Sequence, residues 1–148
     1  MTVVATNKKA YHEFFIEETF EAGIQLVGSE VKSIRNGGVN LKDSFAIVKN
    51  GELFLINAHI SPYKMGSFYN PDPRRERRLL MHKREIDRIA GKVQQKGYAI
   101  VVTKMYFKQS LVKVEVALAK GKELHDKRNA LKEKQLNREV SRALADYR

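Results

Sequence analysis

Cysteine is absent from this chain of 148 residues. Its absence excludes a disulfide framework, a thiolate zinc site and a cysteine nucleophile. Long apolar runs are missing too. None approaches the roughly 18 residues that a membrane span requires, and Met1–Lys9 holds no stretch that could serve as a signal peptide. These absences predict a cytoplasmic protein without a membrane partner.

Motifs for catalysis and for cofactor binding are also missing. The glycine-rich phosphate loops, the G-x-G-x-x-G fingerprint and the G-x-S-x-G nucleophile elbow do not occur. The four histidines stand far apart, without the spacing of a metal site; they are His12, His59, His82 and His125. We therefore expect no catalysis, and neither a metal, a cofactor nor a small-molecule substrate.

Positive charge, by contrast, is abundant and unevenly placed. The chain has 28 Lys and Arg against 17 Asp and Glu, which gives a net charge of +11. Basic and acidic residues are equal in number up to Pro71, so the whole excess lies from Asp72 onward. An excess confined to one part of the chain attracts a polyanion through steering and counterion release. Nucleic acid is the favoured partner, and a merely solvated charged face is the alternative.

Hydrophobic patterns predict a mostly β protein of about six strands. The clearest signal is a hairpin, in which Phe45–Val48 and Leu53–Ile56 flank Asn50-Gly51, the preferred pair of a type I′ turn. Other runs of strand-forming residues are Ala10–Leu26, Tyr98–Phe107 and Leu111–Leu118. Because turns rather than crossover helices join most neighbours, we expect antiparallel strands that close into an OB-like β-barrel.

One or two helices are expected to flank the barrel. Leu79–Gln95 has apolar residues at i, i+3, i+4 and i+7, and Gly97 follows at the C-cap position. Ser29–Arg35 is long enough for one or two turns, with Ser29 as a candidate N-cap. Ser61–Arg78 reads as a long polar loop, which at this length is either functional or disordered.

The character of the sequence changes after Lys120. Lys120-Gly121-Lys122 ends the strands, and the remaining residues lack glycine, proline and strand alternation. An apolar stripe and a basic stripe instead recur at helical spacing: Leu136, Val140, Leu144 and Tyr147, and Lys134, Arg138 and Arg142. An isolated helix of this length is marginal in water. We expect residues 1–121 to form the barrel domain, and residues 122–148 to form a basic tail that is disordered alone and helical when bound.

An arginine-rich run, Arg74–Arg78, lies where the long loop meets the predicted helix. Guanidinium groups pair bidentately with phosphate and stack on bases, so arginine at this density suits folded RNA. Tyr63, Phe68 and Tyr69 precede the run, either as stacking partners for unpaired bases or as core anchors of the loop. A solvated charge run is again the alternative.

Seven short segments spread over nearly the whole chain carry a resemblance to a known family. They are Asn7–Glu13, Glu21–Ile24, Gly28–Ser33 with Arg35, Asp72–Arg75, Arg78–Ile86, Gly97-Tyr98 and Lys120–Arg128. In this order and spacing they resemble the SsrA-binding protein family, also called small protein B. Members of that family partner transfer-messenger RNA in trans-translation, the bacterial rescue of stalled ribosomes.

The resemblance implies an OB-like barrel that binds the tRNA-like domain of transfer-messenger RNA and delivers it to stalled ribosomes. The residues that match RNA-binding positions of the family are Glu30, Leu80 and His82, and core packing is the alternative for Leu80. Neighbouring basic residues are expected to contact phosphate: Lys32, Arg35, Arg74, Arg75, Arg78 and Lys83. Ser29 stands where many family members carry an aromatic residue, so no stacking is expected from it.

A second set of residues is implied to face the small ribosomal subunit. It comprises Lys120, Lys122, His125, Lys127, Arg128, Lys134 and Arg138. By the resemblance, the body of the protein would lie in the decoding region, and the tail would lie as a helix in the empty messenger channel. The ribosomal RNA that lines this channel would offer phosphates to the basic stripe of the tail.

Two other functions stay open. A generic OB-fold protein for single-stranded RNA, or a ribosomal protein, would bind without preference for a tRNA-like fold. An interaction adaptor would instead dock its C-terminal helix into a groove of another protein.

Overall fold

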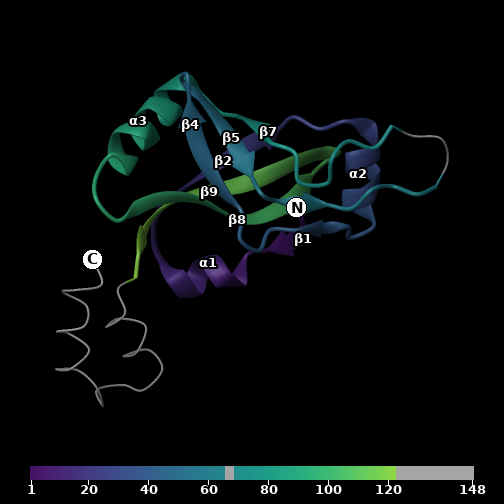
Figure 1. Cartoon of the computed structure of the whole chain (residues 1–148), viewed down its shortest axis with the longest axis horizontal. Helices are drawn as coiled ribbons and strands as arrows, with labels where there is room; N and C mark the ends of the chain where they lie inside the picture. The colour runs from purple at the N-terminus through teal and green to yellow at the C-terminus, as the bar shows by residue number, and fades with distance from the viewer. Residues whose placement is uncertain (66–68, 123–148) are drawn as a thin grey trace, which may run out of the picture.

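The computed structural model describes residues 1–65 and 69–122, and this part of the chain is mostly β (Figure 1). Its strands are β1 (Thr2–Thr6), β2 (Phe14–Ile24), β3 (Val39–Asn40), β4 (Phe45–Lys49), β5 (Glu52–Ile56), β6 (His59–Ile60), β7 (Arg77–Leu80), β8 (Tyr98–Lys108) and β9 (Leu111–Gly121). Its helices are α1 (Lys8–Glu13), α2 (Gly28–Arg35) and α3 (Lys83–Val93). In Figure 1, α2 lies at one end of the sheet, whereas α1 and α3 lie toward the other.

Seven strands form one sheet in the order β1-β8-β4-β5-β7-β2-β9, and β8 also pairs with β9. The last strand of this order, β9, is therefore hydrogen-bonded to its second strand, β8. The link between β4 and β8 is a single residue pair, Ala46 with Ile100, whereas β8 and β9 pair along most of their length. Every pairing in the described residues is antiparallel, which confirms the prediction from the connections.

The predicted hairpin is confirmed as β4 and β5. Lys49 pairs with Glu52, so Asn50-Gly51 is a two-residue loop. Both loop residues have a positive φ, 54° for Asn50 and 77° for Gly51. This is the backbone that a type I′ turn requires, and asparagine and glycine adopt it at least cost.

Apolar clusters pack against both faces of β9. Alternate residues of this strand, such as Val114 and Val116, are buried in the main apolar cluster together with Ile89 of α3. On the opposite face, Ala117 packs with Ala10 of α1 in a second cluster. A small side chain at this position lets the helix lie close to the sheet, so the end of β9 is covered on both sides.

The described residues contain three helices where one or two were predicted, and some boundaries differ from the prediction. Leu79 belongs to β7, where it pairs with Leu53 of β5 and Ile24 of β2, so α3 begins only at Lys83. The predicted helix from Leu79 was therefore wrong in its first turn, because cross-strand pairing outweighs the helical repeat there. The predicted loop likewise ends earlier, since Arg77 already lies in β7.

The predicted strand from Ala10 was also wrong in its first residues, which form α1. Asn7 caps this helix by accepting a hydrogen bond from the Ala10 N–H at 3.2 Å. Helix α2 was placed correctly, but its N-cap is Val27 rather than Ser29. The Ser29 hydroxyl instead donates to the Tyr69 carbonyl at 2.6 Å and ties the long loop to the helix. None of the described helices is long and apolar enough to span a membrane.

Candidate nucleic-acid interface

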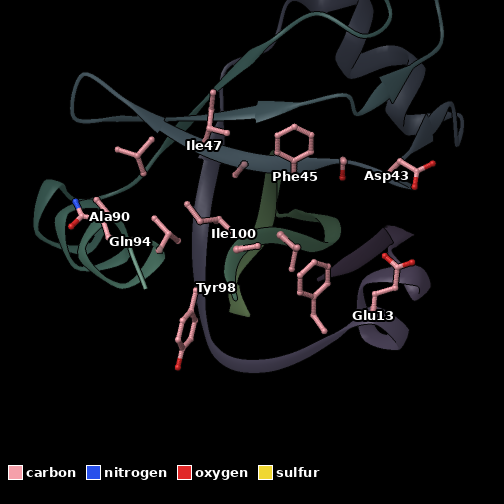
Figure 2. Close-up of a pocket in the computed structure, with 15 residues that line it drawn as sticks. Glu13, Asp43, Phe45, Ile47, Ala90, Gln94, Tyr98 and Ile100 are labelled. Atoms are coloured by element: carbon pink, nitrogen blue, oxygen red, sulfur yellow. The ribbon is translucent and has the colours of Figure 1, made fainter. Parts of the chain in front are cut away.

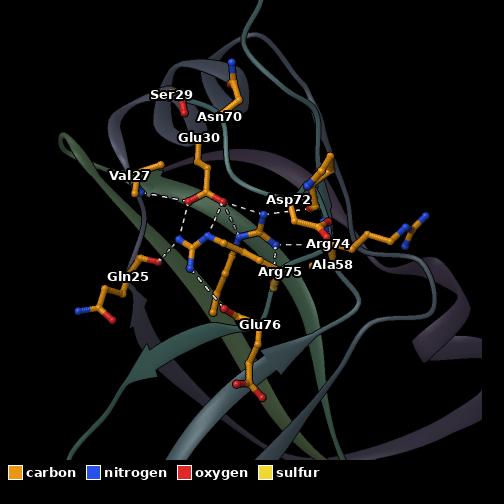
Figure 3. Close-up of polar contacts among 12 residues, drawn as sticks. Gln25, Val27, Ser29, Glu30, Ala58, Asn70, Asp72, Arg74, Arg75 and Glu76 are labelled. Carbon is orange, nitrogen blue, oxygen red and sulfur yellow. Dashed lines mark hydrogen bonds and ion pairs between the residues drawn. The ribbon is translucent and has the colours of Figure 1, made fainter. Parts of the chain in front are cut away.

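A buried carboxylate, that of Glu30 in α2, holds two arginines of the arginine-rich run (Figure 3). Glu30 is 3% exposed and Arg77 is fully buried. Arg75 donates to both Glu30 oxygens, from Nη2 at 2.7 Å and from Nε at 3.1 Å. Arg77 donates from Nε at 2.9 Å, and the Val27 N–H donates at 3.0 Å. The cluster therefore joins the start of α2 to β7 and the loop before it.

Two opposing effects act on the Glu30 carboxyl. Burial would raise its pKa, but hydrogen bonds from Arg75, the Val27 N–H and Arg77 together hold the pKa below its usual range. Burial also lowers the pKa of Arg77, and the Glu30 carboxylate opposes that change. The carboxylate is thus kept ionised by partners inside the protein, and it does not face solvent.

Arg75 is the member of this cluster that reaches the surface, with 29% of its side chain exposed. It is also held by the carbonyls of Gln25 and Glu76, each at 3.3 Å. These contacts leave one Nη1 hydrogen of Arg75 without a partner within the described residues. A guanidinium that is fixed before binding loses little conformational entropy when it meets a phosphate or a base.

The other arginines of the run lie on the surface. Arg74 donates from Nη1 to the Asn57 side-chain oxygen at 3.0 Å. Arg78 forms an ion pair with Glu52 at 2.8 Å, and both side chains are more than 40% exposed, at 44% and 43%. Exposed pairs of this kind contribute only about 0–1 kcal/mol. Arg78 can therefore exchange Glu52 for a phosphate at little cost.

The remaining predicted phosphate contacts lie on two helices. Arg35, at the end of α2, is exposed with its guanidinium carbon 5.5 Å from the centroid of the Phe107 ring. Lys32, one turn earlier, is half-buried. Lys83, at the start of α3, is exposed and 3.4 Å from Asp87. The predicted basic residues thus lie around α2, β7 and the start of α3, and most are exposed.

Leu80 and His82 line an open pocket of about 410 Å³, here called the Leu80 pocket. Its lining residues are Glu21, Gly23, Leu80, Met81, His82, Glu85 and Lys113. Leu80 is 46% exposed, so core packing is not its role. Gly23 lies beside it, since a Cβ on Gly23 would stand 3.4 Å from the Leu80 Cβ, at van der Waals contact. Glu30 does not line this pocket.

Two carboxylates do lie with Leu80 and His82, those of Glu85 and Glu21. Sequence reasoning missed Glu21. Its Oε2 accepts a hydrogen bond from the Tyr106 hydroxyl at 2.6 Å, and its Oε1 accepts from Lys108 Nζ at 3.3 Å. The Tyr106 bond is the main cause that lowers the pKa of Glu21. The sequence does not reveal the strand register that brings Glu21 to this pocket. Gly23 pairs with Leu80, and Glu21 lies on the same face of β2 as Gly23 because side chains alternate along a strand.

Replacing Tyr106 with phenylalanine removes only the hydroxyl that holds Glu21. We expect the pKa of the Glu21 carboxyl to rise toward its ordinary value of 4.5, as measured by NMR titration of the side-chain carbon. Since a lowered pKa stabilises the fold above the unfolded value, the stability difference between wild type and variant should be present above pH 4.5 and fade in acid. Lys108→Ala, which removes the longer contact, should give a smaller rise. An unchanged titration midpoint in Tyr106→Phe would contradict this role.

The residues predicted to face the ribosome are only partly described. Lys120 and Lys122 lie at the end of β9 and just after it, at the other end of β2 from the Leu80 pocket. His125, Lys127, Arg128, Lys134 and Arg138 lie outside the described residues, as does Phe68 of the loop. Tyr69 is 76% exposed and Tyr63 is half-buried. No group of three or more His, Asp or Glu in the described ranges is placed to hold a metal ion.

A larger groove of about 740 Å³ lies apart from these residues (Figure 2). It forms where β4 and β8 part after their single pair, and apolar residues of β4, α3 and β8 dominate its lining, among them Ile47, Val93 and Ile100. None of the predicted RNA-binding residues lines it. We therefore place the candidate site at the exposed cations and the Leu80 pocket rather than at this groove.

Fold and site together describe a small protein of mostly β structure, in which exposed cations lie around α2, β7 and the start of α3, and an open pocket adjoins β7. Comparison with known sequences gives the family. The chain belongs to the SmpB family, because the family model described as SmpB protein matches residues 4–146. This confirms the family predicted from the sequence.

Curated relatives and a solved structure agree with this assignment. The SsrA-binding protein of Caldicellulosiruptor bescii is 58% identical over 145 residues, which are 98% of this chain and 92% of the relative. That of Geobacter sulfurreducens is 55% identical over 144 residues, 97% of this chain and 94% of the relative. A chain from a structure described as "tmRNA-SmpB: a journey to the center of the bacterial ribosome" matches with a TM-score of 0.70 and 47% identity, covering 86% of this chain and 94% of that one.

Proposed function

We propose that this protein binds the tRNA-like domain of transfer-messenger RNA and delivers it to stalled ribosomes for trans-translation. The observation that carries the proposal is the match to SsrA-binding proteins over nearly the full chain, together with the likeness to a chain from a tmRNA–SmpB structure. Its partners are transfer-messenger RNA and the ribosome. We place this work in the cytoplasm, without a small-molecule substrate.

The fold that we propose for residues 1–121 is an OB-like barrel. It is supported by the pairings β8–β4–β5–β7–β2–β9, which return to β8 through the β8–β9 pair. A sheet that closes in this way leaves few edges, which suits a protein that must stay soluble beside other chains. We propose residues 122–148 as a separate basic tail.

Two parts of the interface would do different work. The guanidinium of Arg75, fixed by Glu30, and the exposed Arg78 would hold phosphates of the folded RNA. Glu30 would then act on RNA only through Arg75, because its own oxygens are buried and occupied. In the same way Arg77 would serve the interface by fixing Glu30.

The Leu80 pocket would receive an unpaired base of the tRNA-like domain. Sequence-specific recognition of RNA targets bases that are splayed out of helices. Such a base would meet the apolar side chain of Leu80, the imidazole of His82 for stacking or hydrogen bonding, and the carboxylate of Glu21, which can accept from a base amino group. Lys113 at the rim would neutralise a phosphate.

We expect Leu80→Ala and His82→Ala each to weaken binding of the tRNA-like domain by about tenfold, because stacking and packing on a base contribute about 1–3 kcal/mol. Both side chains are exposed, so thermal stability should stay unchanged. A gel-shift titration with the isolated tRNA-like domain measures the affinity. Val3→Ala is the matched control, since Val3 is 46% exposed, as Leu80 is, but lies on β1.

Competition decides between this function and a generic RNA-binding protein. Unlabelled transfer-messenger RNA should displace the labelled domain far better than unstructured RNA of equal length. Equal displacement by both RNAs would refute recognition of a tRNA-like fold. A fall in thermal stability in His82→Ala would assign that residue to the fold instead.

A further inference from the structure

The groove of about 740 Å³ that β4, α3 and β8 form is here called the Phe45 groove, and apolar side chains such as Phe45, Ile47, Val93 and Ile100 line it (Figure 2). Phe45 and Ile47 lie on the same face of β4, because side chains alternate along a strand. Phe45 is 42% exposed, and Ile47 is half-buried. The solvent-facing side of an antiparallel sheet is usually polar. This apolar face is therefore suited to be covered by another apolar surface.

The charged side chains that line the Phe45 groove in the described residues, Glu13 and Asp43, are both acidic. Asp43 is paired with Lys9, and Glu13 is half-buried. Figure 2 shows the two carboxylates at one end of the groove, with Ala90 and Gln94 at the other. A polyanion such as RNA would meet apolar side chains and negative charge here. The lining instead fits an amphipathic segment that is apolar on one face and basic on another.

The described part of the chain ends beside this groove. The Lys122 N–H donates to the carbonyl of Glu13 at 2.8 Å, and Glu13 lines the groove. Residues 123–148 continue from this point. The 13 residues between Lys122 and Leu136 allow a separation of up to about 45 Å when they are fully extended. The apolar stripe of the tail, which begins at Leu136, is therefore within reach of the groove.

The tail has the pattern that this lining requires. Leu136, Val140, Leu144 and Tyr147 recur at spacings of four, four and three, so a helix that turns about 100° per residue places them on one face. The basic stripe of the tail falls on the opposite face. A helix rises about 16 Å from Leu136 to Tyr147. The six residues Asp43–Val48 that line the groove extend over a similar length, at most about 16 Å.

We propose that residues 134–148 dock in the Phe45 groove as an amphipathic helix, with the apolar stripe against β4 and α3 and the basic stripe toward solvent. The sequence-based expectation was a tail that is disordered alone. In this proposal the body of the same chain is the partner of the tail while no RNA holds it. The proposal goes beyond the proposed function, because it does not depend on which RNA the protein binds.

Covalent linkage makes a weak contact sufficient. A helix of this length is marginal in water by itself, and packing of its apolar face is what stabilises it. Because the tail is joined to the body beside the groove, its effective concentration there is about millimolar. A contact of low intrinsic affinity is then mostly formed, and it is also readily exchanged for another partner. The basic stripe, Lys134, Arg138 and Arg142, stays open to phosphates while the tail is docked.

The test uses the full chain with a single tryptophan. The chain has none of its own, so Phe45→Trp places one indole in the groove. Acrylamide quenching of its emission measures how well the groove is covered. Val140→Asp together with Leu144→Asp should raise the quenching constant about threefold, because a carboxylate is not buried among apolar side chains without a partner. An unchanged constant would show that the tail does not cover the groove, and the proposal would fail.

Ser141→Asp together with Ala145→Asp is the matched control. It adds the same two charges one residue further along, on the opposite face of the helix. Quenching should then equal that of Phe45→Trp alone. An equal rise in both double variants would assign the effect to charge rather than to the apolar stripe and would overturn the proposal. Every variant should bind the isolated tRNA-like domain as the wild type does, so a failure here stays separate from a failure of the proposed function.

A spin label tests the contact with the native groove. The chain has no cysteine, so Ser141→Cys gives one attachment point on the outward face of the docked helix. The label should broaden the NMR amide signals of Ile47 and Val93 and spare those of α2, at the other end of the sheet (Figure 1). Adding Val140→Asp and Leu144→Asp should abolish the broadening. Broadening that arises only between a spin-labelled chain and a second, isotope-labelled chain would place the tail of another copy in the groove and overturn the proposal.

Discussion

Arg77→Ala is expected to lower the free energy of unfolding by about 3–5 kcal/mol, because breaking a buried charge pair leaves the remaining charge without a partner. Arg77 is fully buried, with 0% of its surface accessible to solvent, and Glu30 is 3% exposed. Arg77 also donates to the carbonyls of Ala58 and Pro73, at 3.0 and 2.9 Å. Its loss would remove the donor to the Ala58 carbonyl, whereas the Pro73 carbonyl keeps its hydrogen bond from the Ile60 N–H at 2.9 Å. Urea denaturation at neutral pH measures the change.

Arg78→Ala is the control, one residue further along the same strand. Its ion pair with Glu52 is exposed, with 44% and 43% of the two side chains accessible. Such a pair contributes about 0–1 kcal/mol, so this variant should unfold almost as the wild type does. Similar losses in the two arginine variants would refute the view that Arg77 holds the fold together through Glu30.

Acid should remove part of this stabilisation. The pKa of Glu30 is lowered in the folded protein, so its carboxylate contributes stability above the ordinary value of 4.5. The contribution is lost as the pH falls through the lower folded pKa. The difference in stability between the wild type and Glu30→Gln should therefore be largest at neutral pH and narrow in strong acid.

Removal of residues 123–148 should abolish tagging of stalled chains while leaving RNA binding intact. This division follows from the prediction that the body holds the tRNA-like domain while the tail lies in the empty messenger channel. The cut falls after Lys122, whose N–H donates to the Glu13 carbonyl at 2.8 Å. The last pairs of β9 with β2 and β8 should thus remain. A reconstituted translation reaction with a stalled message measures tagging.

Reversing the charge of Lys127 and Arg128 in the full chain is the finer version of this test. This variant keeps the length of the tail and changes only two charges. It therefore distinguishes electrostatic attraction to ribosomal RNA from the effect of losing the tail altogether. We expect a large loss of tagging with unchanged affinity for the tRNA-like domain. Loss of that affinity in either variant would contradict the division of labour, and intact tagging would contradict the role of the tail.

Local signals in the sequence predicted the parts of the fold that depend on neighbours in the chain. The Asn50-Gly51 turn is such a case, because two residues alone dictate its backbone. The start of α3 was not predictable in this way. Leu79 fits a helical repeat as well as a strand, and only its pairing with Leu53 and Ile24 decides between them.

The candidate site was predictable in its chemistry but not in its arrangement. Arg77 and Arg78 are neighbouring residues of the same type. Alternation of side chains along β7 nevertheless buries the first and exposes the second. An arginine at an inward position carries no hydrophobic signal that could reveal it. Glu30 was predicted from the family resemblance. Glu21 was missed because the pocket that contains Leu80 is assembled from β2, β7, β9 and the start of α3, which are far apart in the sequence.

The single pair between Ala46 and Ile100 makes one seam of the sheet weaker than every other. Fluctuations that part neighbouring strands cost least where the fewest hydrogen bonds must break. Local separation of strands should therefore occur first between β4 and β8, on the side of the sheet near α3. The long ladder of β2 with β9, beside which the Leu80 pocket lies, has many more pairs and should stay closed.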